Sequence, residues 1–486
     1  MSTPSLATPP DSAASSPPAA GSGTAAAARR HGGWLIALGV LVVAVVAVQW
    51  ARTRPGFDPY GWLVWGHQTI HGSLDTNAAP SWKPLPWLFT TPFALLGRFE
   101  MKAWMFLSVA VSLSGIVFAA RIALRLTDAP PERRWAGWIA AVFAGACVLG
   151  IQNAAHYILS AQSDPMIVSL CLGAIDAHLS GRVRSTIVLA VLAGLGRPEV
   201  WAFLGLYTLW AWGRRPESRP WLIGGWVVTF ALWFGIPALT SRSPFVAANN
   251  AMGSGRRLTN DQIFGTVKRF LAINELPVEL AALIAVGLAV WRRQRTVLAL
   301  TAATLLWVVI EIAFALHGWP GLVRYMFEAG GVVIVLAGVA VGWLLCGVPS
   351  PSRRPRVAPP LWIGAAIVAV LVVSMAAEGV GHARDEHIDL RQQRARTAQI
   401  AALTPALNRY GGIAQIKRCG VPVVRLSYQT TAAYTLGVNV SKIGFKLAKA
   451  LSHHVPVVQI VPAPSGPGWV IRGFNQTAAG CRALPH

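Results

Sequence analysis

Hydrophobic segments of the length that crosses a bilayer alternate with short arginine-rich turns along most of this chain. A helix needs about 20 mainly apolar residues to span the hydrocarbon core. Polar backbone groups inside lipid must be satisfied within the segment, so such runs fold as helices. We therefore predict a polytopic α-helical membrane protein. The expected single spans are 34–50, 103–126, 135–152, 166–179, 221–239, 277–291, 297–315, 325–345 and 361–377.

The segment 185–213 is basic at both ends, with Arg182 before it and Arg214 after it. Arginine clusters are retained on the cytoplasmic side, so both ends are expected there. Its middle reads GLGRPEV, and Pro198 ends a helix at the preceding residue. We predict two short helices that meet at this break. The total is then about eleven crossings, with the N-terminus cytoplasmic and the C-terminus outside.

The charge of the chain does not indicate a nucleic-acid partner. The formal net charge is +23 and the pI is about 11.1. However, the arginines lie in short clusters between hydrophobic runs, which is the pattern of the positive-inside bias. Part of the excess can attract anionic lipid headgroups. We expect the lipid bilayer as a partner and no nucleic acid, with the chain as a multi-pass protein of the plasma (inner) membrane.

Three regions are predicted. Residues 1–32 are rich in Ala, Pro, Ser and Gly and are interpreted as a disordered cytoplasmic tail, because the polar lead is too long for a signal peptide. Residues 33–378 form the transmembrane module, with a large first outer loop at 51–102. Residues 379–486 are predicted to be a small extracytoplasmic α/β domain, since a helical pattern ending at a glycine pair precedes β-branched runs such as VPVVQIVPA.

The cysteines divide into two groups. Cys147, Cys171 and Cys346 lie in predicted spans and are most simply buried small apolar residues. Cys419 and Cys481 lie in the C-terminal region, and an extracytoplasmic location favours a disulfide between them. No cysteine or histidine spacing indicates a zinc site.

Asp58 is the carboxylate that we single out in the first outer loop. It stands in FDPYGW, a few residues beyond the first span. A carboxylate fixed at the membrane surface can take a proton from a hydroxyl as a general base. The alternative is a helix start, because Pro59 suits the first helical position.

Lys83, in PSWKPLPWLF, is the corresponding cation. Its ammonium suits a phosphate headgroup, and the neighbouring Trp82 suits an interfacial belt; a snorkelling lysine without a ligand is the alternative. His67 and His71 are four apart and share a helix face, but a third metal ligand is missing. We include Trp82 and His67 among the candidate substrate-binding residues and expect no metal site.

The other candidates are ionisable groups near or within spans. Asp164 precedes a span, where an N-cap is the alternative role. Arg197 and Glu199 flank the break at Pro198, and charged groups at membrane depth usually mark a site or a paired network. They also have the option of simply pairing with each other. Arg324 and Tyr325 open a late span, where Arg324 could bind phosphate or anchor the helix among headgroups.

These motifs occur in an order that resembles a known superfamily. In sequence they are Asp58, Lys83-Pro84, Ser163-Asp164, Arg197-Pro198-Glu199 and Arg324-Tyr325. The order and the topology resemble the GT-C superfamily of polyprenyl-phosphate-dependent glycosyltransferases. Its members include protein O-mannosyltransferases, lipid A aminoarabinose transferases and the actinobacterial cell-envelope mannosyl- and arabinosyltransferases. The resemblance covers about residues 35–345, and the composition is similar to that of the actinobacterial members.

The resemblance implies an enzyme that moves a sugar from a polyprenyl-phosphate donor to an acceptor hydroxyl of a glycan, glycolipid or protein, with inversion. Asp58 would be the general base and Lys83 would bind the donor phosphate. The remaining candidates would line the site: Asp164, Arg197, Glu199, Arg324 and Tyr325.

No cofactor is expected, because no glycine-rich phosphate loop is present. Many members carry an acidic pair in the first loop, whereas Pro59 and Tyr60 follow Asp58 here; this weakens a metal-dependent version and leaves a divalent metal as an open alternative. A transporter or flippase for a lipid-linked or anionic envelope precursor is the alternative function. It accounts for the broken hairpin but not for the long first loop or the C-terminal region.

Overall fold

The computed structural model describes residues 22–253, 255–258, 261–349, 356–357, 359–477 and 481. Helix α1 (Ser22–Ala51) begins inside the segment that we predicted to be a disordered tail. That prediction is wrong for residues 22–32, because the alanines at 25–28 have the highest helix propensity and let the helix extend ahead of its apolar part. Residues 1–21 lie outside the described residues.

The first half of the chain is helical throughout. After α1 come two helices of the predicted outer loop, α2 (Phe57–Ile70) and α3 (Pro84–Phe93). The segment 185–213 consists of two helices, α8 (Val183–Gly196) and α9 (Val200–Arg214), which meet at the predicted break. The others are α4 (Glu100–Thr127), α5 (Arg134–Leu149), α6 (Ala154–Leu159), α7 (Ser163–Leu179), α10 (Arg219–Phe230) and α11 (Ile236–Thr240).

The second half adds five helices to the bundle. Two of them, α12 (Val246–Met252) and α13 (Gln262–Leu271), belong to the connection that follows α11. The others are α14 (Leu276–Arg292), α15 (Arg295–Leu316) and α16 (Phe327–Cys346). Every residue of α16 is buried, so this helix is the centre of the bundle.

Helix α16 can occupy the centre because small residues let its neighbours approach. It packs against α4, α5, α14 and α15. A Cβ atom on Gly338 would overlap Ala144, and one on Gly342 would overlap Thr127. In lipid the hydrophobic effect does not drive helices together, and small residues at their crossings allow close van der Waals packing instead.

Several helices meet the requirements of a membrane span. Within the described residues, six are long and apolar enough, and a seventh results if the bent pair Gln262–Leu271 and Leu276–Arg292 counts as one span. The six are Gly33–Ala51, Pro84–Thr127, Pro216–Thr240, Arg295–Leu316, Val323–Cys346 and Leu361–Arg409. The chain is therefore a multi-pass membrane protein. The count of about eleven crossings stays a prediction, because helices such as α5 and α7 are shorter than this test requires.

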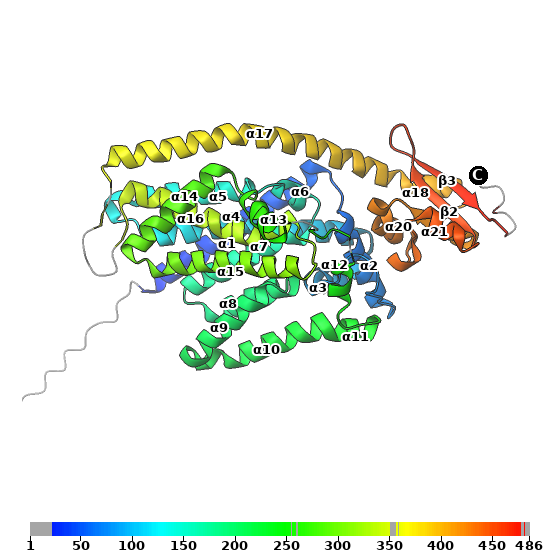
Figure 1. Cartoon of the computed structure of the whole chain (residues 1–486), viewed down its shortest axis with the longest axis horizontal. Coiled ribbons are helices and arrows are strands. Elements are labelled where there is room, and N and C mark those ends of the chain that lie inside the picture. The colour runs from blue at the N-terminus through cyan, green and yellow to red at the C-terminus, as the bar shows by residue number, and fades with distance from the viewer. Residues whose placement is uncertain are drawn as a thin grey trace, which may run out of the picture.

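One long helix joins the bundle to the C-terminal residues. Helix α17 (Leu361–Ala401) runs along the bundle and ends beside the C-terminal elements (Figure 1). The predicted domain boundary at Gly379 lies within this helix and does not interrupt it. Beyond it lie four short helices: α18 (Leu403–Arg409), α19 (Gly412–Cys419), α20 (Gln429–Leu436) and α21 (Leu447–Ser452).

A three-stranded sheet lies among these helices. Its strands are β1 (Val421–Val424), β2 (Val457–Pro462) and β3 (Trp469–Phe474), at the positions of the predicted strands. The order is β1-β2-β3, with β1 parallel to β2 and β2 antiparallel to β3. Val424, Ile460 and Ile471 contribute to a core that is separate from the main core of the bundle. Cys419 and Cys481 are joined by a disulfide with an S–S distance of 2.07 Å.

The C-terminal part docks on α2, the helix that carries Asp58. The Thr430 hydroxyl donates to the backbone carbonyl of Phe57 at 2.6 Å. The Tyr434 hydroxyl donates to the buried Glu100 carboxylate, which also pairs with His67 Nε2 at 2.8 Å. These contacts fix the position of α2 relative to α20.

The His67 contact makes this docking dependent on pH. The hydrogen bond to Glu100 raises the pKa of His67. The pair of protonated His67 with Glu100 contributes its full stabilisation below the ordinary histidine pKa near 6.5. This contribution is lost as the pH rises through the pKa of His67 in the folded protein. We expect the melting temperature in detergent to fall from about pH 6 to about pH 9, and His67→Gln to flatten this slope.

The matched control for this prediction is His71→Gln. His71 is exposed, and its Nδ1 contacts only the backbone carbonyl of His67. This variant should keep the wild-type slope. An equal slope in His67→Gln and wild type would contradict the assignment of the pH dependence to the His67–Glu100 pair.

Candidate functional site

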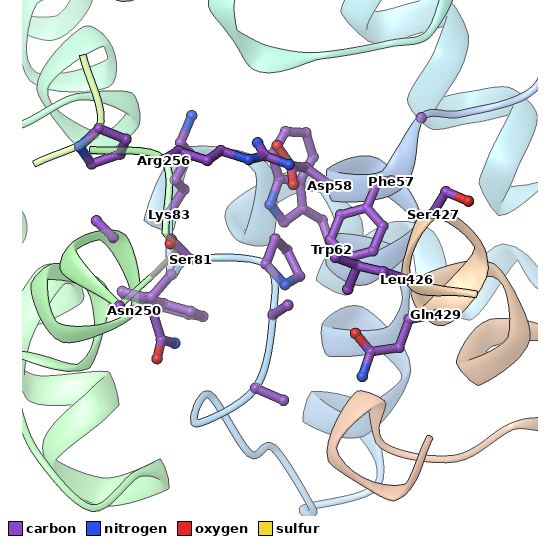
Figure 2. Close-up of a pocket in the computed structure, with 18 of the residues that line it drawn as sticks. Phe57, Asp58, Trp62, Ser81, Lys83, Asn250, Arg256, Leu426, Ser427 and Gln429 are labelled. Atoms are coloured by element: carbon purple, nitrogen blue, oxygen red, sulfur yellow. The ribbon is translucent and has the colours of Figure 1, made fainter. Parts of the chain in front are cut away.

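A large cavity lies where the bundle meets the C-terminal part. Its volume is about 1670 Å³. Figure 2 shows that its labelled lining residues come from three parts of the chain: α2 with the segment before α3, the α12 region, and the residues around α20. Asp58 and Lys83, far apart in their loop, both line it. We call the bundle side the floor, and the side formed by the α12 region and residues 393–453 the wall.

Lys83 belongs to the floor. It is the residue before α3, whose first position is Pro84, a residue preorganised for a helix start. Its Nζ donates to the Ser163 hydroxyl at 3.2 Å. Burial is the main cause of a lowered pKa for Lys83, and the nearby Asp164 carboxylate opposes this shift. Because Lys83 is already largely desolvated, pairing with an incoming anion would cost it little further hydration.

Arg197 is at the centre of a buried network beneath the cavity. Its backbone is extended, as expected for a residue before proline. Its guanidinium hydrogen-bonds to Asp164, lies 3.0 Å from Glu328 and lies 3.7 Å from Glu199. Its side chain and those of the three carboxylates are at most 3% exposed. The predicted pairing of Arg197 with Glu199 is thus one contact of a larger network.

Tyr325 supports the same guanidinium from another side. The Arg197 guanidinium lies 4.4 Å from the centre of the Tyr325 ring. The Trp307 indole N–H donates to the Tyr325 carbonyl at 2.8 Å, which fixes the turn before α16. Tyr325 also lines the cavity, so it separates the buried network from the open space.

Arg324 connects the network to Asp58. Its guanidinium nitrogens lie 3.4 Å from the Asp58 carboxylate and 3.7 Å from Asp164. The Asp58 and Arg324 side chains are 21% and 15% exposed, so both face the cavity. Asp164 is fully buried behind them and does not line the cavity. The structure therefore brings five of the predicted residues together: Asp58, Asp164, Arg197, Glu199 and Arg324.

Two predicted site residues have other surroundings. Trp82 is buried; its indole N–H donates to the Leu232 carbonyl at 3.0 Å, although an edge of it reaches the cavity. His67 does not line the cavity, because the Glu100 carboxylate holds it on the opposite side of α2 at the junction with Tyr434.

Several lining residues were not among the sequence candidates. Glu328, which was not a candidate either, lies behind the lining, 3.0 Å from Arg197. Tyr157 and Trp233 carry no motif and reach the cavity from α6 and from the π-helical turn Ala231–Gly235 after α10. Asn250 and Arg256, which lie in the polar connection after α11, occupy the wall (Figure 2). Within the described part of the chain, no group of three or more His, Cys, Asp or Glu residues is placed to hold a metal ion.

Known structures share this fold. No protein-family model and no curated protein matches it. The crystal structure of ArnT from Cupriavidus metallidurans bound to undecaprenyl phosphate matches with a TM-score of 0.55 and 16% identity, covering 92% of this chain and 99% of that one. The apo structure of the same protein matches with a TM-score of 0.54 and 16% identity, covering 89% and 93%. The chain therefore has the fold of these two structures.

Proposed function

We propose that this protein is an inverting glycosyltransferase that uses a polyprenyl-phosphate sugar as donor and an acceptor hydroxyl on the outer face of the membrane. The observation that carries the proposal is the meeting of Asp58 with Lys83 and Arg324 in one cavity. The fold of ArnT, whose structure contains undecaprenyl phosphate, supports a polyprenyl-phosphate donor. A carboxylate base next to fixed cations is the arrangement that transfer from a phosphate leaving group requires.

The positions of the helix ends support an outer location for the cavity. Helix α8 follows Arg182 and ends at the floor, and α9 leaves the floor and ends at Arg214. Helix α14 likewise ends with Arg292. Arginine-rich turns favour the cytoplasmic side, so the opposite helix ends, which bear the cavity, are proposed to be extracytoplasmic.

The proposed reaction is a single displacement. The Asp58 carboxylate accepts the proton of the acceptor hydroxyl as its oxygen bonds to the anomeric carbon. The bond from this carbon to the phosphate oxygen breaks, and its electron pair leaves with the polyprenyl phosphate. Lys83 and Arg324 stabilise the charge that develops there. Glu199 lines the same cavity and lies 3.7 Å from the Arg197 guanidinium.

Donor binding is proposed to release the base. The Arg324 guanidinium lies 3.4 Å from the Asp58 carboxylate, so the two side chains form an ion pair. The donor phosphate competes for the same guanidinium. Arg324 retains Asp164 as a second partner, so it can turn toward the phosphate without becoming unpaired.

The proposal is tested with purified protein in nanodiscs and a panel of short-chain polyprenyl-phosphate mannose, arabinose, glucose and galactose donors. Acceptor-dependent release of polyprenyl phosphate from one donor is the expected result. Movement of intact donor between leaflets of proteoliposomes, without cleavage, would instead indicate the transporter alternative. Neither cleavage nor binding of any donor would overturn the proposed function.

Lys83 gives donor binding a defined pH dependence. Only its protonated form pairs with a phosphate, and its pKa is lowered. Affinity for undecaprenyl phosphate should therefore fall as the pH rises, and this fall should begin below the ordinary lysine pKa of about 10.4. Lys83→Arg should keep its affinity across the same range, because arginine stays protonated. Equal profiles for Lys83→Arg and wild type, in a binding titration at each pH, would exclude Lys83 as the titrating group.

A further inference from the structure

The C-terminal part has an unusual charge composition. Residues 390–486 contain twelve lysines and arginines and no aspartate or glutamate, so all 19 carboxylate side chains of the protein lie before Leu390. Among the described residues, no lysine or arginine of this segment takes part in an ion pair. Like charges on one surface repel each other, and such a surface attracts ligands of the opposite charge.

Some of these cations have a structural role, and others do not. Arg394 donates to the carbonyls of Trp50 and Ala51 at the end of α1, and Arg396 donates to the carbonyl of Pro55. Cations suit a helix C-terminus, which explains Arg394, and Arg396 holds the segment that follows α1. Lys446, just before α21, and Lys449, within α21, are exposed and line the cavity. Of the two, Lys446 has a weak contact with the Phe445 ring, at 5.9 Å.

Both parts of the wall contribute basic side chains to the cavity. Arg256 contributes to it from the α12 region, and Lys446, Lys449 and His453 contribute from the C-terminal part. None of the wall residues is a carboxylate; the carboxylates that line the cavity, Asp58 and Glu199, both belong to the floor. In the view of Figure 2, Arg256 and Asn250 lie on one side of Asp58, and Ser427 and Gln429 lie on the other.

The donor phosphate does not account for this wall. The floor already supplies Lys83 and Arg324 beside Asp58 for one phosphate. A second group of cations, on the wall of the same cavity, fits a second anion. Clefts lined by one sign of charge concentrate ligands of the opposite sign.

We propose that the wall is the acceptor subsite, and that the acceptor is an anionic chain bearing phosphate or carboxylate groups. This inference rests on the proposed function. Lys446, Lys449 and Arg256 bind the anionic groups, and a hydroxyl of the same chain reaches Asp58. The acceptor is either a soluble anionic glycan or the headgroup of an anionic glycolipid, since both present this chemistry.

The test measures binding to the full-length protein in nanodiscs of neutral phosphatidylcholine. The probes are fluorescent oligo(glycerol phosphate), oligogalacturonate and a neutral dextran oligosaccharide of equal length. Wild type should bind the two anionic probes and not the neutral one, with an affinity that falls as salt is added. Lys446→Glu with Lys449→Glu should weaken anionic binding by about tenfold or more. Equal binding of the neutral probe would overturn the proposal.

The matched control is Lys417→Glu with Arg418→Glu. Both residues are exposed on α19 and do not line the cavity. Their substitution changes the charge of the C-terminal part by the same amount. This control should change the affinity less than about twofold. An equal loss in both variants would show a diffuse attraction to the whole C-terminal part and would overturn the assigned subsite.

Anionic lipid separates the two sources of the ligand. If the wall takes lipid headgroups, phosphatidylglycerol in the same nanodiscs should displace the probes from wild type; if it takes soluble glycans, the probes should stay bound. The binding experiment also distinguishes failure of the acceptor subsite from failure of the proposed reaction. Donor cleavage without anionic binding overturns only the acceptor subsite, and anionic binding without cleavage of any donor overturns only the glycosyltransferase.

Discussion

Asp58→Asn should lower the turnover of polyprenyl-phosphate sugar by about 10²–10⁴-fold, which is the contribution of a positioned general base. The substitution keeps the size of the side chain and removes its ability to take a proton. It also removes the partner that holds Arg324 in the donor-free state, at 3.4 Å. Affinity for undecaprenyl phosphate should therefore be unchanged or higher, because Arg324 is free and a negative charge near the phosphate is gone. Steady-state kinetics and a separate binding titration measure the two effects.

The control for this result is Asp75→Asn. Asp75 is the other aspartate of the first outer loop; it accepts from Asn77 and from the Ser441 hydroxyl, and it does not line the cavity. Its turnover should stay within a few-fold of wild type. Turnover of Asp58→Asn close to that of Asp75→Asn would contradict the base assignment. Weaker donor binding in Asp58→Asn would contradict the proposed competition for Arg324.

Features set by local sequence were predicted well. The break between α8 and α9 follows from Pro198 alone, because proline excludes helical backbone at the residue before it. The strands β1 and β2 follow from runs of valine and isoleucine. The apolar segments likewise correspond to helices, most of which end within a few residues of the expected positions; α1 begins earlier and α17 ends later. Each of these signals acts over a short stretch of chain and needs no tertiary contact.

Features that depend on tertiary contacts or on competing propensities were not predicted. The glycine at Gly379 was taken as a boundary, but a helical glycine costs only about 1 kcal/mol relative to alanine, and α17 continues through it. The partner of Glu328 was unknown because Arg197 is remote in sequence and is brought to it by the packing of α16. Residues of the wall, such as Asn250 and Lys446, have no motif, and their role depends on how α12 and α21 are placed over the floor.

Arg197→Met should destabilise the protein more than any other single change in the floor. The Arg197 guanidinium is the common partner of Asp164, Glu199 and Glu328, which are all buried. Breaking a buried ion pair by removal of one partner costs about 3–5 kcal/mol, because the remaining charge is left uncompensated. Methionine fills a similar volume and supplies no charge. We expect a marked loss of monodisperse protein after heating, followed by fluorescence-detected size-exclusion chromatography in detergent.

A second substitution distinguishes lost charge compensation from lost packing. Glu328→Gln in the Arg197→Met background removes one of the uncompensated carboxylates and should restore part of the stability; the coupling in the double-mutant cycle is expected at about 0.5–3 kcal/mol. Additive effects of the two changes would contradict the electrostatic explanation and leave packing as the cause.

Arg182→Met is the control at the other end of the bundle. Arg182 lies 3.4 Å from the buried Asp176, but its side chain is 54% exposed, and Arg121 and Arg125 remain as partners of that carboxylate. A solvent-exposed partner contributes about 0–1 kcal/mol, so this variant should behave like wild type. Equal stability of Arg197→Met and Arg182→Met would mean that the floor network is not compensated by Arg197. The carboxylates around Arg197 would then have to be neutral, and the floor would lack the fixed charge that positions Arg324 beside Asp58.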